Sequence, residues 1–506
     1  MNLAVLLEMA RESFGGRVAI QAGSDVWSYA ELFAGAGALA RALRASGARH
    51  AALLDVTTPA LPLALFGSAW AGLPFAPLSY RLAPTELEAL LTRIAPVWLA
   101  TDPERATHRA GAGVTPVARD ALLRGARDDA SAQPTPERDW PVDPDAPAVL
   151  LFTSGTTGAP KAAVLRHRHL VSYVLQSVEF GAAAEDEATL VAVPPYHVAG
   201  IAAILSSIYA GRRILQLGQF DASAWIELAR RGRVTHAFVV PTMLARVVDV
   251  LAAEGGTLPH LRSLAYGGGP MPLPVVERAM RLLPHVDFTN AYGLTETSST
   301  IALLGPEDHR AAAASRDPLA RRRLASAGRP LPGIELEIRD PQGRALPTGA
   351  HGEIHVRGDQ VAGEYLEGGS RLGTDGWFPT RDGGWLDAEG FLFVEGRLDD
   401  VIVRGGENLS PGEIEAVLRA HDAVADCAVV GVPDERWGEA VAAVVVPHAG
   451  ARISADALRD WVRSRLRSAR TPERIEFRDA LPYSETGKLL RRRVRAELSD
   501  VEGSGA

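Results

Sequence analysis

The sequence predicts an α/β protein with a large N-terminal domain, made of two layered α/β subdomains and a small β-barrel-like subdomain, followed by an α+β C-terminal domain. Changes of pattern along the chain support this prediction. Before Arg329, apolar strand-like runs alternate with helical patterns, and after it short alternating strands are separated by Gly/Pro turns. Beyond Arg397 comes a compact unit of about 110 residues, a size at which a domain can fold alone.

The composition excludes several classes of protein. A chain of 506 residues is too long for one ordinary core and indicates two or more domains. The net charge of −8 provides no basic field for a nucleic-acid backbone, so nucleic acid is not expected as a partner. The single cysteine, Cys427 in VADCAVVGV, excludes an intramolecular disulfide and predicts a buried thiol in a protein of the reducing cytoplasm.

The first α/β subdomain is predicted over residues 1 to about 125, with helices over 29–45 and 85–94 that alternate with the short apolar strands AALLDV and VWLA. The stretch Val56 to Tyr80 carries no charge and is long enough to span a bilayer. Its four prolines indicate instead a buried helix around 61–70 and a short strand near Phe75, so no transmembrane segment is expected.

The second α/β subdomain is predicted from the strand-like runs AVLLF, TLVAV, RRILQL, THAFVV and RSLAYGG. The C-terminal domain has one clear helix start, SPGE. Ser410 stands at the N-cap, Pro411 at the first helical position and Glu413 at the third. We expect a helix to begin here, with its N-terminus capped by the serine hydroxyl.

The segment TSGTTGAPK, residues 153–161, has the composition of a phosphate-binding loop. It is not a Walker A motif, because Lys161 follows GAP and precedes Ala162. Gly155 and Gly158 allow backbone N–H groups to approach an anion, while hydroxyls and one ammonium supply further donors. Taken alone, the segment fits a phosphate clamp or a tight Gly/Thr hairpin between two strands equally well.

Lysine is rare in this chain. Only Lys161 and Lys488 occur among 53 basic residues, and all the others are arginine. A compact ammonium is needed where a planar guanidinium fork does not fit, so both lysines are candidate functional residues, with chance as the alternative.

Seven motifs occur in an order that resembles the adenylate-forming superfamily, which includes acyl- and aryl-CoA synthetases, luciferases and adenylation domains. They are TSGTTGAPK, PPYHVAG, YGGGP, NAYGLTET, GWFPTRDGG, GRLDD and SETGKLLRR. The resemblance covers about residues 20–495. It implies an N-terminal domain, 1–396, that binds ATP and the acid, and a mobile C-terminal domain, 397–506, that carries Lys488 and pivots at Asp399.

The resemblance also implies a role for individual residues. The ATP β- and γ-phosphates would be held by Thr153, Ser154, Gly155, Thr156, Thr157, Gly158 and Lys161. The adenine would lie between two segments: Gly268, Gly269 and Pro270 on one side, and Asn290, Ala291 and Tyr292 on the other. Thr295 would touch the α-phosphate, Glu296 would bind Mg²⁺, and Asp382 and Arg397 would bind the ribose hydroxyls.

The remaining implied roles concern the acid and CoA. Lys488 would bridge the acid carboxylate and the α-phosphate, because a small cation offsets the repulsion between two anions. His197 would stand at the mouth of the acid pocket, although a lone histidine beside an apolar run also fits a core position. Gly405 and Gly406 would line a pantetheine tunnel, or simply form a turn before the SPGE helix.

One residue departs from the family pattern next to the nucleotide. Arg381 stands in TRD where the family typically has glycine. Its side chain is expected to point to solvent or to the mobile domain. The alternative is that it disturbs ATP binding, which would make thioester formation from a supplied acyl-adenylate the better half-reaction.

The sequence therefore predicts a cytoplasmic acyl-CoA synthetase that converts a carboxylic acid, ATP and CoA to acyl-CoA, AMP and pyrophosphate with Mg²⁺. The acid is expected to be apolar or aromatic, and the enzyme a monomer or homodimer. The alternatives are an acyl-AMP ligase for an acyl carrier protein and an enzyme specialised in the thioester-forming half-reaction.

Overall fold

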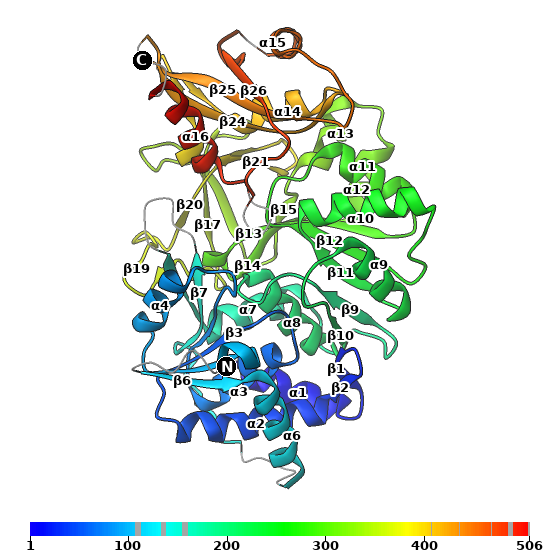
Figure 1. The fold of residues 1–506 in the computed structure, drawn as a ribbon, viewed down its shortest axis with the longest axis vertical. Coiled ribbons are helices and arrows are strands. Elements are labelled where there is room, and N and C mark those ends of the chain that lie inside the picture. Colours follow the sequence, from blue (N-terminus) through cyan, green and yellow to red (C-terminus); the bar gives the residue numbers. More distant parts are fainter. Residues whose placement is uncertain are drawn as a thin grey trace.

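The computed structural model describes residues 1–106, 113–132, 138–153, 160–405, 407–434, 436–466, 468–483 and 489–503. Its strands form four sheets, and the C-terminal part of the chain lies at one end of the molecule (Figure 1). The α/β architecture and the smaller C-terminal domain expected from the sequence are confirmed.

The first sheet has eight strands in the order β19-β18-β8-β7-β4-β3-β5-β6. Its strands β3 to β6 are parallel to their neighbours, whereas β7 and β8 form an antiparallel pair. The strands are β3 (His50–Leu54), β4 (Phe75–Pro77), β5 (Val97–Thr101), β6 (Val114–Ala118), β7 (Pro147–Thr153), β8 (Lys161–Arg166), β18 (Glu364–Tyr365) and β19 (Gly369–Ser370). The associated helices are α2 (Tyr29–Ala45), α3 (Ala60–Ala71), α4 (Pro84–Arg93), α5 (Pro103–Ala106), α6 (Arg119–Ala132) and α7 (His167–Ser177).

The uncharged stretch after Val56 folds as the sequence predicts. The buried α3 and the short strand β4 replace a membrane span, since the prolines interrupt a continuous helix. No helix in the described ranges combines the length and the apolar character that crossing a bilayer requires.

The second sheet has nine strands in the order β15-β14-β13-β12-β11-β9-β10-β1-β2. They are β1 (Val18–Ala22), β2 (Asp25–Ser28), β9 (Ala188–Val191), β10 (Arg213–Gln216), β11 (His236–Val239), β12 (Ser263–Gly267), β13 (Asp287–Leu294), β14 (Ser299–Leu304) and β15 (Arg329–Pro330). The helices are α1 (Leu3–Phe14), α8 (Val198–Ala210), α9 (Ala222–Arg231), α10 (Pro241–Glu254), α11 (Leu273–Leu282), α12 (Pro306–Ala314) and α13 (Pro318–Arg322), with the 3-10 turns η1 (Thr295–Thr297) and η2 (Arg323–Ala325).

The first 28 residues belong to this second sheet, because β1 pairs with β10 and β2 pairs with β1. The sequence placed them with the first α/β subdomain. One continuous apolar core joins both sheets and includes Trp27, Trp70 and Trp225, each almost fully buried. The two α/β subdomains are therefore one packed unit.

The subdomain after Arg329 is a four-stranded antiparallel sheet in the order β16-β17-β20-β21. Its strands are β16 (Glu335–Arg339), β17 (Gly352–Arg357), β20 (Phe378–Leu386) and β21 (Leu392–Arg397). It packs through its own apolar cluster, which reaches Leu294 and Ile301 at the edge of the second sheet.

The C-terminal domain contains β22 (Ile402–Arg404), β23 (Glu407–Leu409), β24 (Val424–Asp434), β25 (Gly438–Pro447) and β26 (Arg474–Phe477). The 3-10 turn η3 (Leu398–Asp400) precedes it, and the other elements are α14 (Pro411–Arg419), α15 (Ala455–Arg463), η4 (Ser468–Arg470) and α16 (Arg491–Gly503). Two apolar clusters made only of its own residues form its core. Cys427 is buried there as a free thiol.

The helix predicted at SPGE is α14, but its cap differs from the prediction. Ser410 Oγ donates to the Glu395 carbonyl oxygen, 3.1 Å away, and makes no cap hydrogen bond to the helix. The serine thus joins the C-terminal domain to the loop end of β21.

Gly293 allows β13 and β14 to approach closely where the chain turns through η1. A Cβ on Gly293 would lie 1.9 Å from the Ser299 carbonyl oxygen. We expect Gly293→Ala to lower the free energy of unfolding by about 1–3 kcal/mol, because the strands must separate. Urea unfolding measures this loss. Gly125→Ala is the matched control, since no atom lies within 4 Å of a Cβ there and alanine favours the α6 helix; equal losses in both variants would contradict the argument.

Candidate active site

One continuous cavity runs along the ends of the second sheet and the four-stranded sheet. It brings together most of the residues implicated by the sequence. Those that line it are Thr153, Lys161, His197, Gly268, Gly269, Pro270, Asn290, Ala291, Tyr292, Thr295, Glu296, Asp382, Arg397 and Asp399.

Other predicted residues cannot be placed in this way. Ser154, Gly155, Thr156, Thr157, Gly158, Gly406 and Lys488 lie outside the described residues. Gly405 forms the turn between β22 and β23 with a φ of 56°, and a Cβ there would lie 2.8 Å from the Trp437 ring. Gly405 is not among the residues that line the cavity.

A buried carboxylate, that of Asp382, lies in the cavity wall and is paired with a tyrosine and an arginine. Asp382 Oδ2 accepts a hydrogen bond of 2.7 Å from the Tyr292 hydroxyl, and Arg397 Nε lies 3.1 Å from Asp382 Oδ1. Arg397 also donates to the Thr380 carbonyl oxygen at 2.9 Å. Burial and the Asp382 carboxylate raise the pKa of Tyr292, so its phenol keeps the proton that it donates. A carboxylate has about four lone-pair sites, so Asp382 can accept further hydroxyl groups.

Glu296 is held by backbone contacts on its turn. Its carbonyl oxygen accepts from the N–H groups of Ala362 and Gly363, at 2.9 and 3.0 Å. The buried hydroxyl of Thr297 closes η1 through contacts with Leu294 and Ser299. These bonds fix the position from which the Glu296 carboxylate reaches the cavity.

Tyr365 is a site residue that the sequence analysis missed. Its hydroxyl donates to Glu296 Oε1 at 2.5 Å, and Lys161 Nζ lies 5.7 Å from its ring centroid. Burial and Glu296 raise its pKa. Tyr365 belongs to β18, which pairs with β8 beside Lys161, and no sequence motif marks it. Only the strand pairing brings it to the site.

The site fits a magnesium ion bound together with a nucleotide. Mg²⁺ usually takes one or two protein carboxylates and completes its octahedron with phosphate oxygens and water. Glu296 supplies one carboxylate, and the described residues contain no cluster of three or more His, Cys, Asp or Glu that could hold a metal alone. The donor set therefore suits a metal that arrives with ATP.

The ends of the TSGTTGAPK segment meet the cavity. Thr153 ends β7 and pairs with Lys161 at the start of β8, so the segment connects an antiparallel hairpin whose two ends both line the cavity. In the two segments that the sequence predicts to hold the adenine, Gly268 has a φ of 80° and Asn290 Nδ2 donates to the Ser326 carbonyl oxygen at 2.8 Å.

His197 stands at the N-cap of α8, in the cavity wall. Its ring lies 5.3 Å from that of Tyr196, which in turn meets Tyr80 edge-on at 5.8 Å. Its Nε2 is buried and has no hydrogen-bond partner in the part of the chain that the structure describes. Burial lowers its pKa from 6.5 to about 4, so the ring is neutral at pH 7.

Arg381 turns toward the junction between the domains. Its Nη2 lies 2.6 Å from Asp399 Oδ1, its backbone N–H donates to Glu353, and its φ is 64°. A left-handed backbone is the reason why glycine suits this position. The side chain is 58% exposed, which agrees with the expectation that it points to solvent and the C-terminal domain.

Comparisons with known proteins agree with the geometry. A family model described as AMP-binding enzyme matches residues 7–366, and one described as AMP-binding enzyme C-terminal domain matches residues 413–488. A feruloyl-CoA synthase of Amycolatopsis sp is 35% identical over 94% of this chain and 95% of its own length. An indoleacetate–CoA ligase of Aromatoleum aromaticum is 34% identical over 95% of each chain.

Solved structures are similar along almost the whole chain. The o-succinylbenzoate CoA synthetase of Bacillus subtilis, in complex with its acyl-adenylate intermediate, is 30% identical, with a TM-score of 0.82 over 97% of each chain. The same enzyme in complex with ATP and a magnesium ion gives a TM-score of 0.81 at 29% identity, over 96% of this chain and 98% of its own.

Replacement of His197 tests its buried neutral state. The unfolded chain binds a proton at His197 below about pH 6.5 and the folded chain only below about pH 4, so acid favours unfolding by about 2 kcal/mol at pH 5. His197→Phe should remove that loss, measured as the change in unfolding free energy between pH 7 and pH 5. His285→Phe, at an exposed histidine, should keep it. An unchanged pH dependence in His197→Phe would show that the ring is not buried neutral.

Arg381→Gly tests where the guanidinium acts. Glycine removes a left-handed strain of about 1–2 kcal/mol, partly offset by loss of an exposed ion pair of about 0–1 kcal/mol. We expect a small gain in unfolding free energy, similar to that of Arg233→Gly, where φ is 52° on the surface. We also expect unchanged ATP–pyrophosphate exchange. A large rise in exchange for Arg381→Gly alone would show that Arg381 obstructs the nucleotide.

Proposed function

The chain belongs to the AMP-binding enzyme family, and we propose which residues of its cavity bind each substrate of the reaction. The protein is an AMP-forming acid–CoA ligase, which uses ATP, Mg²⁺ and CoA. The carrier-protein and thioester-only alternatives are not favoured. The observation that carries the proposal is the single cavity shared by Glu296, Asp382, Arg397 and His197.

The nucleotide end of the cavity is assigned to Gly268–Pro270, Asn290–Tyr292, Asp382 and Arg397. The Asp382–Arg397 pair would hold the ribose hydroxyls, since the carboxylate accepts and the guanidinium donates. Glu296 would hold the Mg²⁺, which when bound neutralises charge on the phosphate oxygens. Thr295 precedes Glu296 on the same turn and would contact the α-phosphate.

The reaction is an in-line displacement followed by acyl transfer. The acid carboxylate attacks the α-phosphorus of ATP and pyrophosphate leaves; the CoA thiol then attacks the acyl carbon and AMP leaves. Lys161 would bind the departing pyrophosphate. Lys488 would stand between the carboxylate and the α-phosphate, where a compact cation stabilises the charge that develops. Two sites that need a small cation are consistent with a chain that otherwise uses only arginine.

The domains are assigned to residues 1–396 and 397–506, with the pivot at Asp399. Separate apolar clusters on the two sides of η3 support this boundary. A single segment of the chain, between β21 and β22, connects the two domains. Rotation about η3 would therefore move the C-terminal domain as a rigid body. In a second arrangement of the two domains, the loop at Gly405 would line the tunnel that holds the pantetheine of CoA.

The acid is assigned as apolar or aromatic. The cavity beyond His197 is bounded by Phe238, Val198 and several alanines of α8, which provide apolar surface and little bulk. We also place the enzyme in the reducing cytoplasm, in keeping with the single buried thiol of Cys427.

Incubation with ATP, CoA and a panel of acids tests this function, with acyl-AMP and acyl-CoA scored by mass. We expect aryl and other apolar acids to form both products. Lys488→Gln should lower acyl-AMP formation by about 10²–10³, as loss of a charge-stabilising group does, while thioester formation from supplied acyl-AMP persists. Arg463→Gln, which removes an exposed charge of the C-terminal domain that does not line the cavity, is the control. Equal rates of adenylation in the two variants would remove Lys488 from the mechanism.

A further inference from the structure

The acid pocket ends in polar residues rather than apolar ones. Three strands of the second sheet place Thr189, His236 and Ser263 side by side, since His236 is in register with both of the others. We call these three residues the polar row. All three line the same cavity as the nucleotide residues.

The space above the polar row is open. Phe238, Ala265 and Thr289 form the next row toward the nucleotide, and they remain half-buried although they lie in the middle of a sheet. Residues of α8 at helical spacing, Ala199, Ala203 and Ser206, face the same cavity. The alanine and serine side chains of α8 and the small Ala265 of the sheet therefore leave a channel between α8 and the sheet, with Phe238 beside it.

The channel is long enough for an extended acid. From Gly267, at the nucleotide end of β12, to Ser263 in the polar row is four residues, or about 13 Å at the usual rise of a strand. An acid held with its carboxylate at the nucleotide end would bring its remote end to the polar row.

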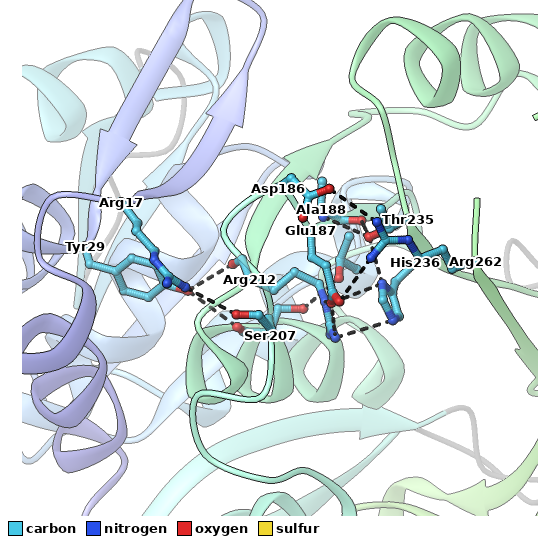
Figure 2. Close-up of polar contacts among 12 residues, drawn as sticks. Arg17, Tyr29, Asp186, Glu187, Ala188, Ser207, Arg212, Thr235, His236 and Arg262 are labelled. Atoms are coloured by element: carbon cyan, nitrogen blue, oxygen red, sulfur yellow. Dashed lines mark hydrogen bonds and ion pairs between the residues drawn. The ribbon is translucent and has the colours of Figure 1, made fainter. Parts of the chain in front are cut away.

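The polar row is backed by a compensated ion network (Figure 2). Glu187 accepts from Arg212 at 3.0 and 3.1 Å, and Arg262 lies 3.5 Å from Glu187 and 3.3 Å from Asp186. Two arginines are thus matched by two carboxylates, so the end of the channel carries no net charge.

His236 completes this network in its neutral form. Its Nδ1 lies 2.8 Å from Thr235 Oγ1 and its Nε2 lies 3.4 Å from Arg212 Nη2. Thr235 Oγ1 donates to the Ala188 carbonyl oxygen, which assigns Nδ1 as the protonated nitrogen and Nε2 as the acceptor. Burial and Arg212 lower the pKa of His236 to about 4, in agreement with this assignment.

The hydroxyls of the polar row are suited to a neutral ligand. Ser207 Oγ of α8 donates a hydrogen bond of 3.2 Å to Thr189 Oγ1, which fixes the threonine side chain on the side of the sheet that α8 covers. Hydroxyl groups both donate and accept, whereas a second carboxylate at this depth would need a cation that Glu187 and Asp186 already match.

We propose that the acid substrate is elongated and carries a neutral hydrogen-bonding group, such as a hydroxyl, at the end remote from its carboxylate, and that Thr189 and Ser263 recognise that group. This inference rests on the proposed function, because it requires the acid to lie in this channel. It makes the polar row a specificity-determining part of the enzyme.

The experiment compares 10-hydroxydecanoate with decanoate by kcat/KM for acyl-CoA formation. The two acids differ only in the remote hydroxyl, and their extended chains are about as long as the channel. The wild type should prefer the hydroxylated acid by about tenfold or more, since a site built to bond a hydroxyl rejects an analogue without it. Thr189→Val with Ser263→Ala should abolish the preference and retain turnover of decanoate. Thr101→Val, at a buried threonine of the first sheet, should retain the preference.

Equal use of the two acids by the wild type, or the same preference in the wild type and the double variant, would overturn the inference while leaving the proposed function intact. Failure of both acids, with other acids of the panel turned over, would also overturn the inference alone. Failure of every acid in the panel would contradict the proposed function and the inference with it. The Glu187→Gln variant tests whether the charge of Arg212 is balanced by Glu187. With Arg212 no longer matched, decanedioate should gain about tenfold in kcat/KM relative to the wild type, and no gain would contradict the compensated network.

Discussion

The pairing of the buried Asp382 carboxylate with Tyr292 and Arg397 is the interaction on which the arrangement of the active site depends. A charge at this depth is stable only when it is paired and hydrogen-bonded. Tyr292 and Arg397 meet that need from β13 and β21, while Asp382 itself lies on β20. The second sheet and the four-stranded sheet are thereby held together at the nucleotide end of the cavity. The same pairing presents a guanidinium and a carboxylate in fixed positions, so the requirement for stability and the geometry for binding coincide.

The turn η1, which carries Glu296, depends on the close approach of β13 and β14. Gly293 lets β14 come against β13, and the hydroxyl of Thr297 closes the turn that carries Glu296. Tyr365 then joins Glu296 to the first sheet, beside Lys161. This end of the cavity is therefore assembled from the first and second sheets, with Lys161 and Tyr365 from one and Glu296 from the other.

The sequence predicted individual helices and strands better than it predicted which of them pair and pack together. The α3–β4 segment and the helix after Ser410 are confirmed because prolines and apolar spacing act locally. The membership of β1 and β2 in the second sheet could not be read, because pairing with β10 is a tertiary contact. Tyr365 was missed for the same reason. Arg381 was noticed only as a departure from a pattern, and its ion pair with Asp399 and its positive φ depend on the backbone that the fold imposes.

The acid channel shows how the two kinds of information combine. The motif PPYHVAG predicts a pocket mouth at His197, but nothing in the sequence connects Thr189, Ser207, His236 and Ser263, which are spread over 75 positions. The register of three parallel strands and one covering helix brings them to one depth. Because Glu187 and Asp186 match the charges of Arg212 and Arg262, that depth is polar without being ionic. With the nucleotide assigned as proposed, the channel has a charged nucleotide end, an apolar middle and a neutral polar end, an order that an acid with one remote hydroxyl would match along its length.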